Sequence, residues 1–224
     1  MYSLAFVISN GDGSPEFMRQ AEAWRKYHTD LGERADIYPM PLADLPLEKR
    51  YAAVSKVIAG LSGELIEQVA FFCHGWPSGI QLVPLNKINQ LARDLAAKVV
   101  SSSLLVTLYC CSTASDTDPK TPEMQDTGTG GDGGFADLLR DALCAQGFFD
   151  CQVDAHTTAG HTTQNPYVRR FEGHGIPTGG VGGQWIVTPR SKQWAKWSAA
   201  LKKGTFRFAF PFQSMFEIHT QLDK

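Results

Sequence analysis

Two apolar segments of the chain each end in residues that can carry out chemistry. Residues 69–72 run into Cys73-His74-Gly75, and residues 104–109 run into Cys110-Cys111-Ser112. A cysteine thiolate attacks carbonyl carbons readily, and a neighbouring histidine can polarise or protonate the reacting group. We therefore predict Cys111 as a nucleophile assisted by His74, with the backbone N–H groups of Gly75 and Cys111 holding the developing oxyanion.

The same residues also have a purely structural interpretation. Cys73, Cys110 and Cys111 can be small buried hydrophobic residues, and His74 can be a turn histidine with satisfied hydrogen bonds. Either segment taken alone favours this interpretation. Their joint placement at the two ends of one strand–helix–strand unit favours the catalytic one.

The segment between the two motifs predicts how they are positioned. Short apolar runs bounded by turn formers are typical of buried parallel strands. Between them, Ile88, Leu91, Leu95 and Val99 repeat at helical spacing after Asn86, the expected N-cap. Such units are right-handed and usually join neighbouring parallel strands about 4.8 Å apart. Both motifs are then expected at the carboxyl edge of one sheet, where ligands bind in open α/β folds.

The remaining pattern predicts an α/β fold, a three-layer α/β/α sandwich around a mostly parallel sheet of about six strands. The expected strands are 4–9, 36–38, 69–72, 104–109, 151–155 and 184–187. Further helices are expected from Ser14, as N-cap, to Gly32, over 51–61, from 135 to about 147, and from the N-cap Ser191 to Gly204. Residues 165–170 are expected to form a basic, aromatic turn, either lining a cleft or, as is more common for such segments, lying on the surface.

No repeat or linker divides the chain, so residues 1–224 are expected to form one domain. Its C-terminal part, residues 190–224, is expected to add a helix and an edge strand carrying Phe206, Phe208, Phe210 and Phe212. Pro211 is tolerated in such a strand.

The charge and hydropathy of the chain exclude several kinds of partner. The 21 basic and 23 acidic residues give a net charge of −2, which leaves no basic excess for nucleic acid. No apolar run approaches the roughly 18 residues that a membrane span needs. The five cysteines are odd in number and two are adjacent, which argues against a disulfide framework. With no recognisable leader sequence, a reducing, cytoplasmic location is expected.

The two motifs resemble those of the caspase-like cysteine peptidases, the clan that includes caspases, metacaspases, legumain, gingipains and separase. In that family the His of a His-Gly pair ends the third strand and the nucleophilic Cys ends the fourth. The resemblance maps these roles onto His74, Gly75 and Cys111, and as a topology it covers residues 4–155. It implies a caspase-like domain that cleaves a peptide or protein substrate as a cysteine endopeptidase.

The chain also departs from the pattern of this family. His74 and Cys111 are 37 residues apart, whereas the caspase signature spans about 50, and the motif around Cys111 is not of the Gln-Ala-Cys form. A Ser directly after the Cys is similar to separase and favours Cys111 over Cys110. Tyr109 takes the place of a specificity residue of the relatives. Tyr109, Asp12 and His156 are the candidates for substrate contact, and no residue preference is carried over.

The long polar segment 112–132 has two interpretations. Its charged residues include Asp116, Asp118, Lys120, Glu123 and Asp126. In the family it resembles, this region often shapes the cleft or is cut during activation. It is therefore either a mobile, processed flap or a solvated loop without a role.

Two other functions are compatible with the sequence. His74-Gly75-Trp76-Pro77 looks like the oxyanion loop of α/β-hydrolases, which predicts an esterase, but the segment 109–113 lacks both glycines of a nucleophile elbow. A degenerate caspase-like module would instead bind partners through residues 112–132 and 156–183. Homo-oligomer formation is left open.

Neither a cofactor nor a metal is expected. Residues 128–133 match a Gly-x-Gly-x-x-Gly fingerprint, but the residues before them are polar and turn-like, whereas the fingerprint requires a strand there. His156, His161, His174, Cys144 and Cys151 gather in one region of the sequence, but their spacing fits no familiar zinc site.

Overall fold

The structure, a computed structural model, describes residues 2–61, 66–99, 102–115, 129–160, 163–173 and 182–204. Three of the expectations above fall outside these ranges. They concern most of the acidic loop, residues 116–128, part of the proposed second binding loop, residues 161–162 and 174–181, and the edge strand around residues 206–212.

The described residues form a large sheet, a small sheet and five α-helices. The strands of the large sheet are, in chain order, β1 (Tyr2–Ile8), β2 (Arg34–Met40), β3 (Ile66–Phe72), β7 (Leu105–Tyr109), β8 (Thr129–Gly130), β9 (Gln152–His156), β10 (Val168–Glu172) and β11 (Gly183–Trp185). The small sheet contains β4 (Gly75–Trp76), β5 (Gly79–Ile80) and β6 (Val83–Pro84). The helices are α1 (Ser14–Asp30), α2 (Leu47–Gly60), α3 (Ile88–Ala96), α4 (Phe135–Cys144) and α5 (Lys192–Lys203), with the short 3-10 helix η1 (Leu85–Lys87) before α3.

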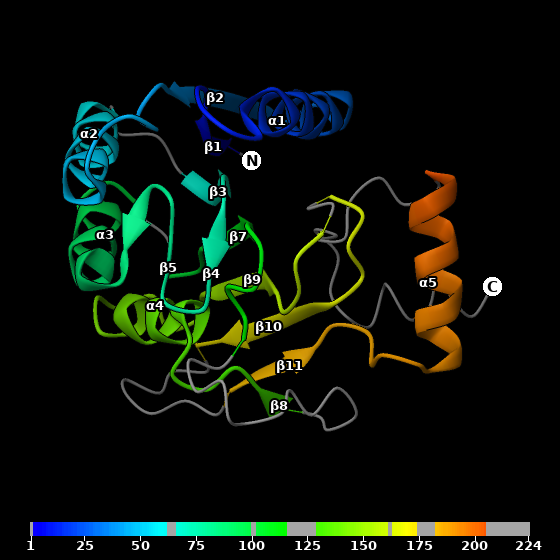
Figure 1. The fold of residues 1–224 in the computed structure, drawn as a ribbon. Coiled ribbons are helices and arrows are strands. Elements are labelled where there is room, and N and C mark those ends of the chain that lie inside the picture. Colours follow the sequence, from blue (N-terminus) through cyan, green and yellow to red (C-terminus); the bar gives the residue numbers. More distant parts are fainter. Residues whose placement is uncertain are drawn as a thin grey trace.

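The order of strands in the large sheet is β2-β1-β3-β7-β9-β10-β11-β8. The first five strands are parallel, and the last three pair antiparallel. The chain moves one way from β1 to β2 and then the other way through β3, β7 and β9. Because crossovers are right-handed, α1 covers one face of the sheet and α2, α3 and α4 cover the other. Figure 1 shows this layered arrangement, with α5 on the side of α1.

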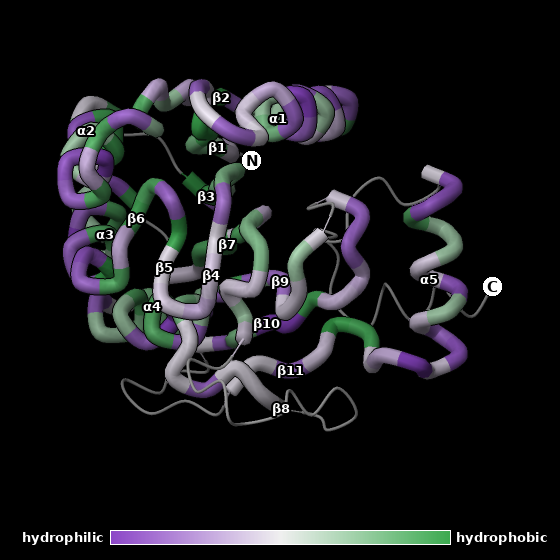
Figure 2. Tube along the Cα trace, in the orientation of Figure 1, coloured by the Kyte–Doolittle hydropathy of each residue, from purple (hydrophilic) through white to green (hydrophobic). Residues whose placement is uncertain are grey.

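The core consists of the apolar strands and the inner sides of the helices. All seven residues of β1 are buried, and β3 is buried except for Glu67. Trp24 of α1 and Trp197 of α5 are both 0% exposed. Figure 2 shows hydrophobic residues gathered in the central strands and hydrophilic residues on the outer sides of the helices. Among the described residues, no helix is long and apolar enough to cross a membrane.

The α/β class and the mostly parallel sheet are confirmed. The large sheet exceeds the expected six strands because β8 and β10 were not predicted, and the small sheet of β4, β5 and β6 was not predicted either. The cap of α5 is also confirmed, since the Ser191 side chain accepts the N–H of Trp194 at 3.0 Å. Two other predicted caps are wrong. Gly13, in a left-handed conformation, precedes α1 in place of Ser14, and Lys87 precedes α3 in place of Asn86 because η1 intervenes.

The basic segment 165–170 is only partly the surface turn that the sequence predicts. Its second half is the start of β10, a strand in the interior of the sheet. Arg169 and Arg170 are 1% and 4% exposed. Arg170 lies opposite Asp154 of β9 and binds its carboxylate through two hydrogen bonds of 2.7 Å. This fixed carboxylate is what makes a buried arginine tolerable.

Candidate active site

The carboxyl ends of four neighbouring parallel strands gather the predicted site residues along one edge of the sheet. In sheet order, β1 leads to the turn with Asp12, β3 to His74, β7 to Cys111, and β9 ends at His156. The direction of the chain through the sheet reverses between β1 and β3. Such a switch point opens a crevice outside the strand ends and is the usual ligand site of open α/β sheets. His74 therefore lies where this topology places ligands.

The loop after β1 holds the imidazole of His74. His74 Nε2 lies 3.1 Å from the Asp12 carbonyl oxygen and 3.6 Å from its carboxylate. Phe17 meets the ring edge-on at 5.0 Å between centroids, and Gly13 adopts a positive φ of 72° beside it. A carbonyl oxygen only accepts hydrogen bonds, so Nε2 carries the proton. In the neutral ring, Nδ1 is then the nitrogen with a free lone pair.

Cys111 lies in a tight turn that is fixed against the end of β9. Ala114 N–H donates to the His156 carbonyl at 2.9 Å, and Ser112 N–H donates to the Thr158 carbonyl at 3.4 Å. Ser112 has a φ of +56°, a left-handed conformation that is uncommon outside glycine and often found at functional sites. The Cys111 thiol is half-buried and faces the Gly160 carbonyl at 3.9 Å.

Gly75 brings the two motifs into direct contact. A Cβ added at Gly75 would lie 2.7 Å from Cys110 Cβ, 2.8 Å from Thr113 Cγ2 and 2.9 Å from the Cys111 carbonyl oxygen. Real side chains do not tolerate such distances, so only glycine allows the chain after His74 to pack on the turn after β7. A glycine can also leave room for a substrate backbone, but the space beside Gly75 is filled by the turn that carries Cys111.

The cysteines next to the motifs are placed differently from Cys111. Cys73 and Cys110 are both 0% exposed, and their sulfur atoms lie 3.6 Å apart. Burial, followed by the neighbouring Cys73 thiol, raises the pKa of Cys110 well above its ordinary value. Cys110 therefore stays protonated and enclosed, while Cys111 is the thiol that a substrate can reach.

Two of the three candidates for substrate contact are buried beneath the edge. Tyr109 is 0% exposed and stacks on Phe72 at 4.3 Å with an angle of 7° between the rings. Its burial raises its pKa well above the ordinary value. His156 is also 0% exposed and supports the Cys111 turn through its backbone carbonyl. These positions argue against direct substrate contact by either side chain, whereas the Asp12 side chain is 97% exposed.

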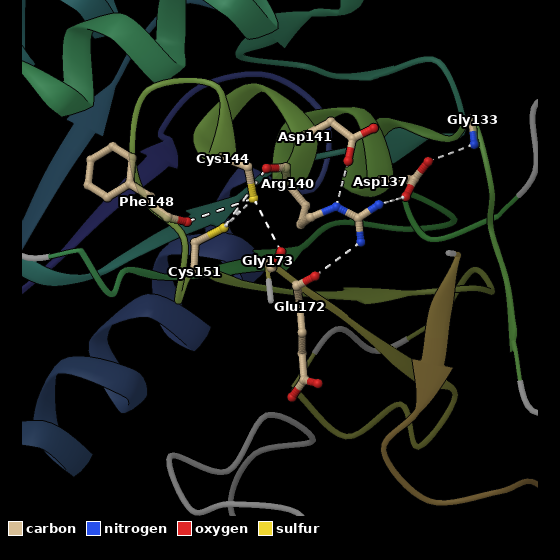
Figure 3. Close-up of polar contacts among 9 residues, drawn as sticks. All are labelled: Gly133, Asp137, Arg140, Asp141, Cys144, Phe148, Cys151, Glu172 and Gly173. Carbon is tan, nitrogen blue, oxygen red and sulfur yellow. Dashed lines mark hydrogen bonds and ion pairs between the residues drawn. The ribbon is translucent and has the colours of Figure 1, made fainter. Parts of the chain in front are cut away.

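In the Gly-x-Gly-x-x-Gly segment, the backbone N–H of Gly133 is already occupied and is not available to bind a phosphate. Its N–H donates to the Asp137 carboxylate at 2.9 Å, and the same carboxylate also binds Arg140 within α4 (Figure 3). Burial outweighs both contacts and raises the pKa of Asp137 to about 6.

The His and Cys residues that are close together in the sequence do not come together in a zinc site. Cys144 and Cys151 lie 3.9 Å apart between α4 and the start of β9 (Figure 3), whereas His156 is at the other end of that strand. His161 and His174 are outside the described residues. In the part of the chain that the structure describes, no three His, Cys, Asp or Glu side chains are grouped to hold a metal ion.

An apolar surface pocket of about 310 Å³ lies between α3 and α4. It is lined by Leu85, Ile88, Asn89, Leu138, Asp141, Ala142 and Ala145. These residues lie on the helical face and include none of the reactive side chains at the strand ends, so the pocket is separate from the candidate site.

Several contributors to the site were not identified from the sequence. The Asp12 backbone carbonyl, the conformation of Ser112 and the carbonyls of Thr158 and Gly160 all act through the backbone, which residue types do not reveal. The one available signal was Asn10-Gly11-Asp12-Gly13, because two glycines in a four-residue turn favour positive φ and a close approach.

No family model matches this chain, and neither a curated protein nor a solved structure matches it. The likeness to caspase-like peptidases therefore depends on the two motifs and the strand topology of this chain alone.

Proposed function

We propose that the protein is a cysteine peptidase of caspase-like type, with Cys111 as nucleophile and His74 as general base and acid. The observation that carries this proposal is the packing of Gly75 on the turn of Cys111, which brings the ends of β3 and β7 together. The position of His74 beside the topological switch point supports it independently.

The tautomer of His74 sets the direction of proton transfer. Because Nε2–H is held by the Asp12 carbonyl, Nδ1 is the atom that takes the proton from the Cys111 thiol. The thiolate then attacks the scissile carbonyl carbon, and the carbonyl oxygen becomes an oxyanion. The backbone N–H groups of Gly75 and Cys111 are the proposed donors to this oxyanion.

The remaining steps return the enzyme to its starting state. The tetrahedral intermediate collapses, the C–N bond breaks, and the proton on His74 Nδ1 passes to the leaving amine. The acyl group remains on Cys111 as a thioester. Water, deprotonated by His74, then attacks the thioester, and the released thiolate recovers the proton. Asp12 is a positioning residue in this scheme, since it touches only the imidazole.

The proposal also includes the setting in which the protein works. The proposed substrate is a peptide or protein, as the likeness of the two motifs to caspase-like peptidases implies, and the half-buried Cys111 thiol at the carboxyl edge of the sheet is compatible with it. A reducing, cytoplasmic compartment suits the free thiols that the structure describes. The scheme requires no cofactor.

Digestion of a peptide library, read by mass spectrometry, tests this function. Cys111→Ala is expected to lower the cleavage rate by about 10⁴-fold or more, since a lost nucleophile removes the covalent route. Cys144→Ala is the matched control, because its thiol is buried between α4 and β9, and it should cleave like the wild type.

Each other outcome has a defined meaning. Cleavage that survives Cys111→Ala would overturn the proposal. Hydrolysis of esters but not of peptides that survives this change would identify the α/β-hydrolase alternative. Absence of any turnover by the wild type, together with specific retention of a protein partner, would identify the interaction module.

A further inference from the structure

Two pairs of buried cysteines accompany the single half-buried Cys111. Cys73 and Cys110 have their sulfur atoms 3.6 Å apart, and Cys144 and Cys151 have theirs 3.9 Å apart. All four are at most 1% exposed. The odd number of cysteines in the sequence argued against a disulfide framework. In the structure, the five cysteines form two close pairs and leave Cys111 as the remaining thiol.

We propose that Cys73 and Cys110 form a reversible disulfide that inactivates the site above them. The two residues directly follow the paired residues Phe72 and Tyr109 on neighbouring strands. Neighbouring strands are about 4.8 Å apart, which is within the Cα separation that disulfides span. Cys110 S–H points to the Phe71 carbonyl at 3.5 Å, which leaves its lone pairs directed to the Cys73 thiol.

The movement needed for this bond is transmitted to the reactive residues. The sulfur atoms must approach by about 1.5 Å to reach a bond length of about 2.05 Å. On the side of the strands that precedes the two cysteines, the stacked rings of Phe72 and Tyr109 resist movement. On the other side, His74 and Cys111 directly follow the two cysteines in the chain. Closure of the disulfide therefore shifts His74 and Cys111, and a displacement of about 1 Å at a reacting group costs roughly 100-fold in rate.

The contact at Gly75 strengthens this coupling. Cys110 Cβ already lies only 2.7 Å from where a Cβ of residue 75 would be, so a displaced Cys110 presses on the backbone that follows His74. The pair near α4 has no such connection, because Cys151 precedes β9 and lies at the opposite end of the strand from His156.

The oxidant is a hydroperoxide, and the chemistry balances. Both thiols are enclosed in the closed structure, so the reaction proceeds through transient opening of the strand ends. Peroxide then oxidises one thiol of the pair to a sulfenic acid, and its other oxygen leaves as water. The sulfur of the other thiol then attacks, and the S–O bond breaks as the S–S bond forms. The second oxygen leaves as water with the remaining proton. Two thiols and one hydrogen peroxide thus give one disulfide and two waters, and a dithiol such as dithiothreitol reverses the reaction.

Peptide mapping of the full-length protein tests the proposal. The reduced protein is treated with hydrogen peroxide, exposed to an electrophilic peptide probe, blocked with iodoacetamide and digested with trypsin without reduction. No Lys or Arg separates Cys110 from Cys111. A peptide that carries the cross-link therefore also records whether Cys111 in the same molecule reacted with the probe.

The expected product is a cross-link between the peptides of Cys73 and Cys110, with Cys111 blocked by iodoacetamide and not by the probe. Probe labelling in cross-linked molecules should fall by roughly 100-fold and return after dithiothreitol. Cys144→Ala should behave like the wild type, and Cys73→Ala and Cys110→Ser should each lose the cross-link.

Two results would overturn the proposal. One is no cross-link in wild-type samples in which Cys111 is itself oxidised, and the other is equal labelling of Cys111 in cross-linked and reduced molecules. The effect on Cys111 depends on the proposed function, but the cross-link does not. If the reduced protein takes no probe at Cys111, the peptidase proposal fails while the disulfide is still scored.

Discussion

The parallel and antiparallel parts of the large sheet are stabilised in different ways. The central parallel strands β1 and β3 bury mainly apolar side chains, such as Phe6, Phe71 and Phe72. The antiparallel strand β10 instead buries Arg169 and Arg170, one stacked on Trp185 at 4.3 Å and the other bound to Asp154. Burial of apolar area is favourable wherever it occurs, whereas a buried charge depends on its partner. The antiparallel part is thus more sensitive to single polar substitutions.

Removal of the Asp154 carboxylate should have the largest effect on stability. Asp154→Ala leaves the Arg170 guanidinium buried without its partner, which costs about 3–5 kcal/mol of unfolding free energy. Glu16→Ala is the matched control, since Glu16 pairs with Arg19 on the exposed face of α1, and it should cost no more than about 1 kcal/mol. Urea unfolding of both variants measures the difference. Equal losses would show that the buried arginine of the antiparallel part depends no more on its partner than an exposed arginine does.

A side chain at position 75 tests the tight contact in the parallel part. Gly75→Ala should destabilise the protein by about 1–3 kcal/mol, because the new Cβ overlaps Cys110, Thr113 and the Cys111 carbonyl. It should also slow the reaction of Cys111 with a peptide electrophile.

Gly60→Ala provides the control for this substitution, since a Cβ at that position in α2 meets no atom within 4 Å. The Tm of this variant should equal or slightly exceed that of the wild type. Its rate of probe labelling at Cys111 should be unchanged. If Gly75→Ala behaves in the same way, the two strand ends do not pack as described.

The smallest expected effect is a pH dependence near the antiparallel part. The folded pKa of Asp137 is raised to about 6 by burial, above the unfolded value of about 3.9. A raised carboxyl pKa stabilises the fold at low pH, and this stabilisation is lost as the pH rises from about 4 through about 6. Between pH 4 and 7 the loss should be about 2 kcal/mol, somewhat less than the full value for two pKa units because the unfolded carboxyl is already about half-ionised at pH 4.

Urea unfolding between pH 4 and 7 measures this dependence, with Asp137→Asn as the comparison. The asparagine has no charge to bury, so its stability should vary less over this range. Superimposable profiles for the two proteins would show that Asp137 ionises in the folded state as easily as in the unfolded chain.

Hydrophobic patterning explains which elements could be predicted. The strands around Phe6, Phe71 and Leu108 consist mainly of apolar residues and were expected close to their observed positions, although β3 begins three residues earlier than expected. Strand β10 was missed because two adjacent arginines indicate a surface, and their partners lie in other strands. Strand β8 was missed because two residues within a glycine-rich segment carry no period.

The candidate site shows the same division. The sequence placed His74 and Cys111 on one edge because each follows an apolar run, and adjacent strands require no knowledge of side-chain contacts. It assigned Tyr109 and His156 to substrate contact, although both side chains are buried within the layers that cover the two faces of the sheet. The roles of the Asp12 carbonyl and of the space at Gly75 depend on backbone geometry, which only the three-dimensional structure provides.

The central claim is that Cys111 and His74 act together, and competitive labelling tests it most directly. An electrophilic peptide probe, added to the reduced protein and mapped by mass spectrometry, is expected to modify Cys111 in preference to Cys73, Cys110, Cys144 and Cys151. His74→Ala should lower the labelling rate by about 100-fold or more, in the range typical of a lost acid–base group. Uniform labelling of the five cysteines, or a rate unchanged by His74→Ala, would contradict the claim.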